Sequence, residues 1–231
     1  MARLDPKLAI RSSIASAVRD EINLDLSVQD AIARDYVNLS ALARMLKPRI
    51  SERTGKKVKD ESVITALKRL RGTYSNTSAA IGSIIAGSVI NVRTHVSKVS
   101  VEKTRKTLQA VSSMLSSHQE DFIQVSESNS SITLIFDQRL HKKVARELYG
   151  AELLEEGDDY AAITVQSPKE IILTPGCVIS FYNQLSRRHV NIEDTVSCHT
   201  DTIIVVKMRD VGRAFDALTE LINEERRKAE Y

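Results

Sequence analysis

The chain has 231 residues, enough for two or three small domains, and its 42% hydrophobic and 27% charged residues are typical of a folded globular protein rather than a disordered one. The formal net charge of +3 is unevenly distributed, because residues 1–72 hold 15 Lys and Arg against 9 Asp and Glu and the rest holds 18 against 21. The N-terminus lacks a signal-peptide core, and the longest weakly polar stretch, residues 79–92, is too short and mixed to span a bilayer, so we expect no membrane partner.

The first part of the chain has the periodicity of helices. Ile10, Ile14, Val18 and Ile22 recur at helical spacing, which predicts an amphipathic helix over residues 7–22. A second, shorter helix is expected over residues 27–34, with its apolar side chains facing inward. These elements predict a small helical domain, residues 1–72.

Two further helices in this domain have clear end signals. Asn38 or Ser40 can cap the first by accepting hydrogen bonds from free backbone amides, and Gly55 is expected to end it. Asp60 is expected to cap the second, and Gly72 to end it.

This helix pair is strongly basic, with ten Lys and Arg against three Asp and Glu between Arg44 and Arg71. It resembles a helix-turn-helix of the winged type, although no two-stranded wing follows Gly72. The resemblance implies a double-stranded DNA partner, with the second helix in the major groove. The side chains expected to face base edges are Ser62, Thr65 and Arg69, and those expected at phosphates are Lys56, Lys57, Lys59, Lys68 and Arg71. The alternative is a small helical bundle whose basic face is solvated or meets an acidic partner.

Residues 73–87 are rich in small and polar side chains before they become apolar, and we expect a linker there. The remainder alternates strands and helices and repeats itself. Val125-Ser126 and Ile132 reappear as Val196-Ser197 and Ile203, at an offset of 71 residues.

Each copy of the repeat has the order strand, helix, two strands and helix. In the first copy these cover residues 88–97, 102–117, 121–136 and 139–150, and in the second 160–166, 176–189, 191–208 and 210–227. The fold class expected is therefore α+β: a small winged-helix-like helical domain, then two ferredoxin-like sandwich units at residues 88–158 and 159–231. Two such units can extend one sheet or pack face to face.

The second copy contains the segment TPGCVISFYNQLSRRHVNIEDTV, with a Pro175-Gly176 turn, and continues through the IIVV strand to the last helix. In these features it resembles the ACT domains that end aspartate kinases and other amino-acid-regulated enzymes. The first copy is degenerate, because its turn, KVSVEK, has no glycine. The resemblance implies that an amino acid or related small metabolite binds between paired domains, and so a homodimer or higher homo-oligomer. The residues that it assigns to the ligand are Pro175, Gly176, Cys177, Val178, Asn191 and Ile192.

A glycine at this turn has a physical reason, because a side chain there would keep a ligand from the backbone and from the free amides of the helix N-terminus. The other interpretation is that the turn is only a turn, in a domain that serves for assembly. Cys177 departs from the residues usual in the family.

No feature of the sequence indicates a catalytic activity. The Gly82 to Gly87 spacing lacks the Lys and Ser/Thr of a phosphate loop, and no nucleophile, base and orienting group occur at a recognisable spacing. Cys177 and Cys198, with His189 and His199, match no zinc pattern, so we expect neither a metal nor a cofactor. Cys177 is either an inert buried thiol, which we favour, or a redox-sensitive one. The two unpaired cysteines favour a cytoplasmic location.

These features together predict a small-molecule-sensing regulator and not an enzyme. In the first hypothesis it is a DNA-binding transcriptional regulator whose ligand changes the spacing of two protomers. In the second, the ACT-like part assembles with a metabolic enzyme and regulates it without DNA.

Overall fold

The computed structural model describes residues 13–230, apart from the side chains of residues 75–78. The chain forms two compact units, Met1–Ala80 and Ile81–Tyr231. The part of the first predicted helix that precedes residue 13 lies outside the described residues. No helix in the described part of the chain is long and apolar enough to cross a membrane.

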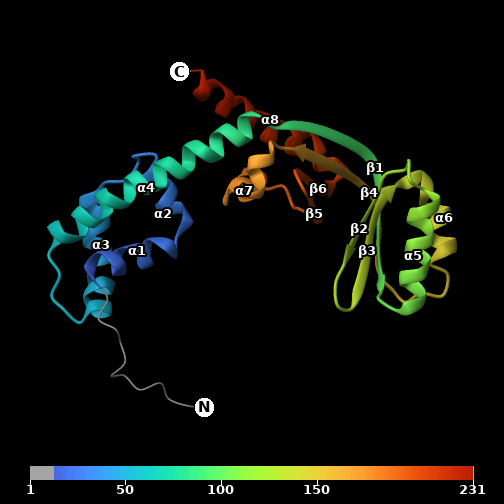
Figure 1. Ribbon diagram of the computed structural model, residues 1–231, viewed down its shortest axis with the longest axis horizontal. Coiled ribbons are helices and arrows are strands. Elements are labelled where there is room, and N and C mark those ends of the chain that lie inside the picture. The colour runs from blue at the N-terminus through green and yellow to red at the C-terminus, as the bar shows by residue number, and fades with distance from the viewer. Residues whose placement is uncertain (1–12, 231) are drawn as a thin grey trace, which may run out of the picture. The chain divides into compact units, whose positions relative to one another are not determined.

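The described part of the first unit is helical (Figure 1). Its elements are α1 (Ile14–Asn23), α2 (Leu26–Ala33), α3 (Leu39–Thr54) and the first turns of α4 (Asp60–Ala86). As predicted, the Asn38 side chain caps α3 by accepting from the amides of Ser40 and Ala41, and Gly55 ends it in a left-handed conformation. The core is made of aliphatic side chains from all four helices, including Val18, Ile22, Ile32, Leu42, Leu46, Ile50, Val63 and Leu67.

One expectation for this unit needs correction, and another is not confirmed. The predicted helix end at Gly72 is wrong, because α4 continues through it for 14 more residues, to Ala86. The residues expected to form a linker, 73–87, are therefore almost entirely helical. The winged-helix form is not confirmed, because residues 13–80 contain no β-strand that could serve as a wing.

The second unit is built on one six-stranded antiparallel sheet, with the strand order β2-β3-β1-β4-β6-β5. The strands are β1 (Val89–Glu102), β2 (Ile123–Glu127), β3 (Ser131–Asp137), β4 (Leu153–Gln166), β5 (Asp194–Cys198) and β6 (Asp201–Lys207). Two helices, α5 (Arg105–Ser117) and α6 (His141–Glu147), accompany the half with β2 and β3. The other half has α7 (Cys177–Arg187) and α8 (Val211–Ala229), as Figure 1 shows.

The two halves share their long central strands. The end of β1, from Val96 to Glu102, pairs with β3, whereas its beginning, from Val89 to Arg93, pairs only with the end of β4. The beginning of β1 therefore completes the sheet of the second half. The expected boundary between the two units, at residues 158 and 159, lies inside β4.

Three apolar clusters hold this unit together. One lies under α5 and α6 and contains Phe136, and a second lies under α7 and α8 and contains Phe181. The third lies on the opposite face of the sheet and brings Ile135 of β3 together with Ile203 and Val205 of β6. Val96 of β1 and Ala162 of β4 lie between them in the same cluster, so this face is apolar across the middle of the sheet. The two repeats therefore extend one sheet.

Candidate functional site

The turn before α7 has an open helix N-terminus. Gly176 occupies the N-cap position with φ 101°, a left-handed conformation that favours glycine, and no side chain caps the helix. The Gly176 carbonyl accepts from the amide and the hydroxyl of Ser180. The first backbone amides of α7 thus have no side-chain acceptor, and the helix dipole adds partial positive charge there.

Ile81 of α4 lies directly against this glycine. A Cβ built on residue 176 would be 2.7 Å from Ile81 Cδ1, closer than real Cβ contacts allow. Both residues belong to the second unit, and Ile81 also packs on the core under α7 and α8. The surroundings of the turn are therefore apolar on the side that α4 covers.

The other predicted residues of this turn differ in exposure. Pro175 is exposed and Val178 is half-buried. Cys177 is only 1% exposed, and burial raises the pKa of its thiol because an apolar environment disfavours the thiolate. These features favour an inert thiol over a redox-sensitive one.

Asn191 and Ile192 lie elsewhere in the same unit. Because β4 and β5 both run antiparallel to β6, they are parallel to each other, and α7 connects the end of one to the start of the other. Asn191 and Ile192 precede β5 and so lie at the C-terminal end of α7, about 16 Å along the helix from Gly176. The chain does not bring the two groups of predicted ligand residues together. The strand expected from residue 191 begins only at Asp194.

A buried lysine fixes the segment that follows Ile192. Lys98 of β1, 7% exposed, reaches across the helix-free face and donates to the Glu193 carbonyl. Its Nζ lies 2.9 Å from the Glu155 carboxylate and 3.4 Å from that of Asp194. Burial by itself would lower the pKa of Lys98, but the hydrogen bond to Glu155 and the charge of Asp194 outweigh it and raise that pKa. One ammonium group thus joins the two halves of the sheet.

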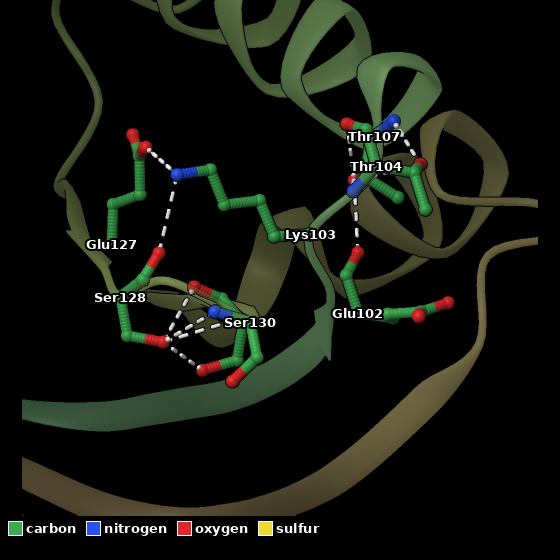
Figure 2. Close-up of polar contacts among 8 residues, drawn as sticks. Glu102, Lys103, Thr104, Thr107, Glu127, Ser128 and Ser130 are labelled. Atoms are coloured by element: carbon green, nitrogen blue, oxygen red, sulfur yellow. Dashed lines mark hydrogen bonds and ion pairs between the residues drawn. The ribbon is translucent and has the colours of Figure 1, made fainter.

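The corresponding turn of the first half is closed, as Figure 2 shows. Thr104 caps α5 by accepting from the Thr107 amide, and Thr107 Oγ1 accepts in return from the Thr104 amide. The hydroxyl of Thr107 also donates to the Glu102 carbonyl. This capping box satisfies amide donors that remain without a side-chain acceptor at α7.

Lys103 closes the same turn from its other side. Its Nζ lies 2.5 Å from Glu127 Oε1 and donates to the Ser128 carbonyl, which ties the turn to the β2–β3 hairpin (Figure 2). Its backbone amide donates to the Ser130 carbonyl. The two repeats therefore differ at the position where the second is open.

The eight residues predicted to contact DNA are all exposed. Three of them lie in the turn between α3 and α4, and the other five lie on α4. Ser62, Thr65 and Arg69 line a shallow depression of about 380 Å³ with Glu61 and the start of α1. Arg71 forms an ion pair with Asp35, at 2.7 Å. The side chains predicted to meet base edges thus share one surface, which also carries an acidic group.

The described residues include no group of three or more His, Cys, Asp or Glu side chains arranged to hold a metal ion. Cys198 is exposed on β5, whereas Cys177 is buried at the start of α7.

Two residues of the site were not predicted from the sequence. Ile81 lies in the segment expected to be a linker. The helical spacing of Ile81 and Ile85 could have indicated that this segment is a helix packed on a core. No local sequence pattern indicated the role of Lys98, because its partner Asp194 is 96 residues away in the sequence.

Comparison with protein families matches residues 155–220 to the ACT domain. No curated protein matches the chain. Among solved structures, the aspartate kinase of Synechocystis is similar over 60% of this chain and 27% of its own, with 17% identity and a TM-score of 0.50. This likeness shows a shared fold.

Two other structures are similar at lower scores. The aspartate kinase of Clostridium acetobutylicum has 16% identity and a TM-score of 0.49, over 58% of this chain and 34% of its own. The regulatory subunit of aspartate kinase from Thermus thermophilus, in a ligand-free form, has 10% identity and a TM-score of 0.48, over 57% and 95%. The chain thus spans about a third of the length of the Clostridium enzyme.

Proposed function

We propose that the protein is a regulator that senses an amino acid or a related small metabolite at the Gly176 turn. The observation that carries this proposal is the contrast between the two repeats. The turn in the ACT-matching segment presents uncapped amides, which suit a carboxylate, whereas capping and Lys103 close the other turn. One ligand site per chain follows from this difference.

Gly176 and Asn191 lie at opposite ends of α7, so one chain cannot present both to the same small ligand. A ligand that contacts both groups needs the turn of one chain and the start of β5 of another. The proposal therefore includes a homodimer or higher homo-oligomer, in which two copies supply the two sides of each site.

We expect one proteinogenic amino acid to raise the melting temperature of the full chain, because a ligand specific for the folded state stabilises it by about 1.4 kcal/mol at about ten times its Kd. Differential scanning fluorimetry across the amino acids measures this. Gly176→Ala is expected to remove the shift, and Gly212→Ala, where a Cβ meets open space on α8, to retain it. If no amino acid moves the melting temperature, amino-acid sensing is wrong and assembly becomes the better explanation.

The finer part of the proposal is that the basic face of the first unit binds double-stranded DNA. It is supported by the exposure of all eight predicted residues and by the net positive charge of residues 1–72. The rival is regulation of a metabolic enzyme through assembly, without DNA.

Replacing Lys56, Lys57 and Lys59 with alanine is expected to weaken DNA binding at low salt and to flatten its salt dependence, since each lost phosphate contact reduces the slope of log K against log salt by about 0.9. Fluorescence anisotropy with a labelled duplex measures both. The matched control replaces Lys142, Lys143 and Arg146, three exposed cations on α6, with alanine and should leave binding unchanged. Equal effects of the two triple variants, or no binding by the parent chain, would exclude this DNA interface and favour the enzyme-regulating role.

A further inference from the structure

A cavity of about 240 Å³ lies between α6 and the first half of the sheet. The buried side chains of Val99 and Val101, on the helix-covered face of β1, line it from the side of the sheet. Val144 of α6, and Leu148 just after this helix, line it from the other side and are also buried. The interior of the cavity is therefore apolar.

The second half of the sheet fills the equivalent position with a side chain of its own. Ile163 of β4 is equivalent to Val99 of β1, because each pairs with the second hairpin strand of its own half and with the other central strand. Ile85, 2% exposed, packs in the same apolar cluster as Ile163. Ile85 and Tyr149 each lie four residues before a central strand begins, but Tyr149 is 83% exposed. The aliphatic side chain that fills this position in the second half thus has no buried counterpart in the first, where the cavity lies.

A carboxylate lies at one end of the cavity. Glu156 of β4 is where the second half has Val92 of β1, because each pairs with the equivalent residue of the other central strand. Glu156 and His141 both line the cavity, and Glu156 Oε1 lies 2.8 Å from His141 Nε2. The other ring nitrogen, Nδ1, lies 3.3 Å from Asp158 Oδ1. Two carboxylates thus meet one imidazole, so these three groups together are negative even when the imidazole is protonated, and they favour a cation.

The remaining residues leave the cavity accessible from solvent. Tyr149 and Leu153 line it and are 83% and 53% exposed, so apolar side chains border its opening. Lys106 lies near Gly150, another lining residue, but its Nζ donates to the Tyr149 carbonyl. An apolar interior with a few convergent polar groups is the usual form of a small-molecule site.

We propose that this cavity binds a small primary amine that carries a branched aliphatic or an aromatic group. The ammonium group donates to the Glu156 carboxylate in a charge-assisted hydrogen bond, and His141 positions that carboxylate. The apolar group packs on Val99 and Val101, as Ile85 packs on the equivalent core of the second half. Sites for drug-sized molecules have volumes of about 300–1,000 Å³, so this cavity suits a smaller molecule. The cavity lies in the first half, so its ligand does not depend on the amino-acid site proposed at the Gly176 turn.

Phenethylamine is the probe that tests the cavity, because it has an ammonium group and an aromatic ring but no carboxylate for the Gly176 turn. It is titrated into the isotopically labelled full chain, and the chemical shifts of the backbone amides are followed by nuclear magnetic resonance. We expect saturable shifts concentrated in residues 99–101 and 141–156. Phenethyl alcohol, of the same size but uncharged, should bind about tenfold more weakly, because it cannot pair with a carboxylate as an ion.

Two variants locate the site. Glu156→Gln keeps the size of the side chain but removes its charge, and it should weaken phenethylamine binding about tenfold or more. The matched control is Glu147→Gln, an exposed residue of α6 that does not line the cavity, and it should leave the affinity unchanged. Ala145→Leu enlarges an exposed residue that does line the cavity, and it should prevent binding by occupying the space.

The amine site is wrong if phenethylamine causes no saturable shift up to millimolar concentrations, or if its shifts lie outside the lining residues. Equal affinities for the amine and the alcohol, or equal effects of Glu156→Gln and Glu147→Gln, would also overturn it, because the carboxylate would then have no part in binding. If Glu156→Gln does not fold, the comparison of the two probes and the Ala145→Leu variant still decide the question. A failure here leaves amino-acid sensing standing, since phenethylamine is not an amino acid and none of these variants alters the Gly176 turn.

Discussion

Replacing Phe181 with alanine is expected to lower the free energy of unfolding of the second unit by about 3–5 kcal/mol. Phe181 is fully buried between α7 and the sheet, beside Leu185 and Ile204. Removing its ring loses the free energy of burying it and leaves a cavity that the neighbouring strands can fill only in part. Urea unfolding followed by circular dichroism measures the loss.

The matched control is Phe215→Ala on α8. Phe215 is 39% exposed, so the same chemical change removes less buried surface and should cost about 1–2 kcal/mol. Equal losses for the two variants would contradict the placement of α7 on the sheet, and with it the orientation of the Gly176 turn.

The second large effect is expected at Lys98. Lys98→Met keeps an apolar side chain between the two halves of the sheet but removes the charge that pairs with Glu155 and Asp194. We expect the free energy of unfolding to fall by about 2–3 kcal/mol at neutral pH. Lys142→Met, at an exposed lysine of α6, should cost almost nothing.

The pH dependence of this loss follows from the raised pKa of Lys98. A lysine whose pKa is higher in the folded state stabilises the fold fully below the pKa of the unfolded chain, about 10.4, and this contribution disappears as the pH rises through the folded value. The difference in unfolding free energy between parent and variant should therefore be constant near neutrality and shrink in alkali. A difference that grows above about pH 10.4 would contradict a charged Lys98.

The internal repeat was the part of the fold most accessible from the sequence. Strands β2 and β5 begin and end 71 residues apart, the offset at which Val125 and Val196 correspond. The caps of α3 were also predictable, because Asn38 and Gly55 act through contacts within a few residues. Local sequence patterns of this kind predict the structure correctly when no distant contact in the folded chain opposes them.

The predictions that were wrong concern features that depend on contacts between residues far apart in the sequence. Gly72 favours a helix end by about 1 kcal/mol, but burial of side chains on both sides of it, at Leu70 and Ile85, outweighs that preference. The division of β1 between two sheet halves depends on register, which composition does not encode. The same limit applies to the site, because Ile81 approaches Gly176 across 95 residues of sequence.

The shared strand β1 affects how the chain folds during synthesis. Val89 and its neighbours leave the ribosome early, but Gln166, with which Val89 pairs, follows 77 residues later. The half that contains Gly176 cannot close its sheet until almost the whole chain has been made, and such long-range pairing is slow. A fragment starting at residue 159 would lack this strand and expose the edge of β4. Expression of the half that contains Gly176 therefore has to begin upstream of Val89, and loss of one repeat would leave the other without a pairing strand.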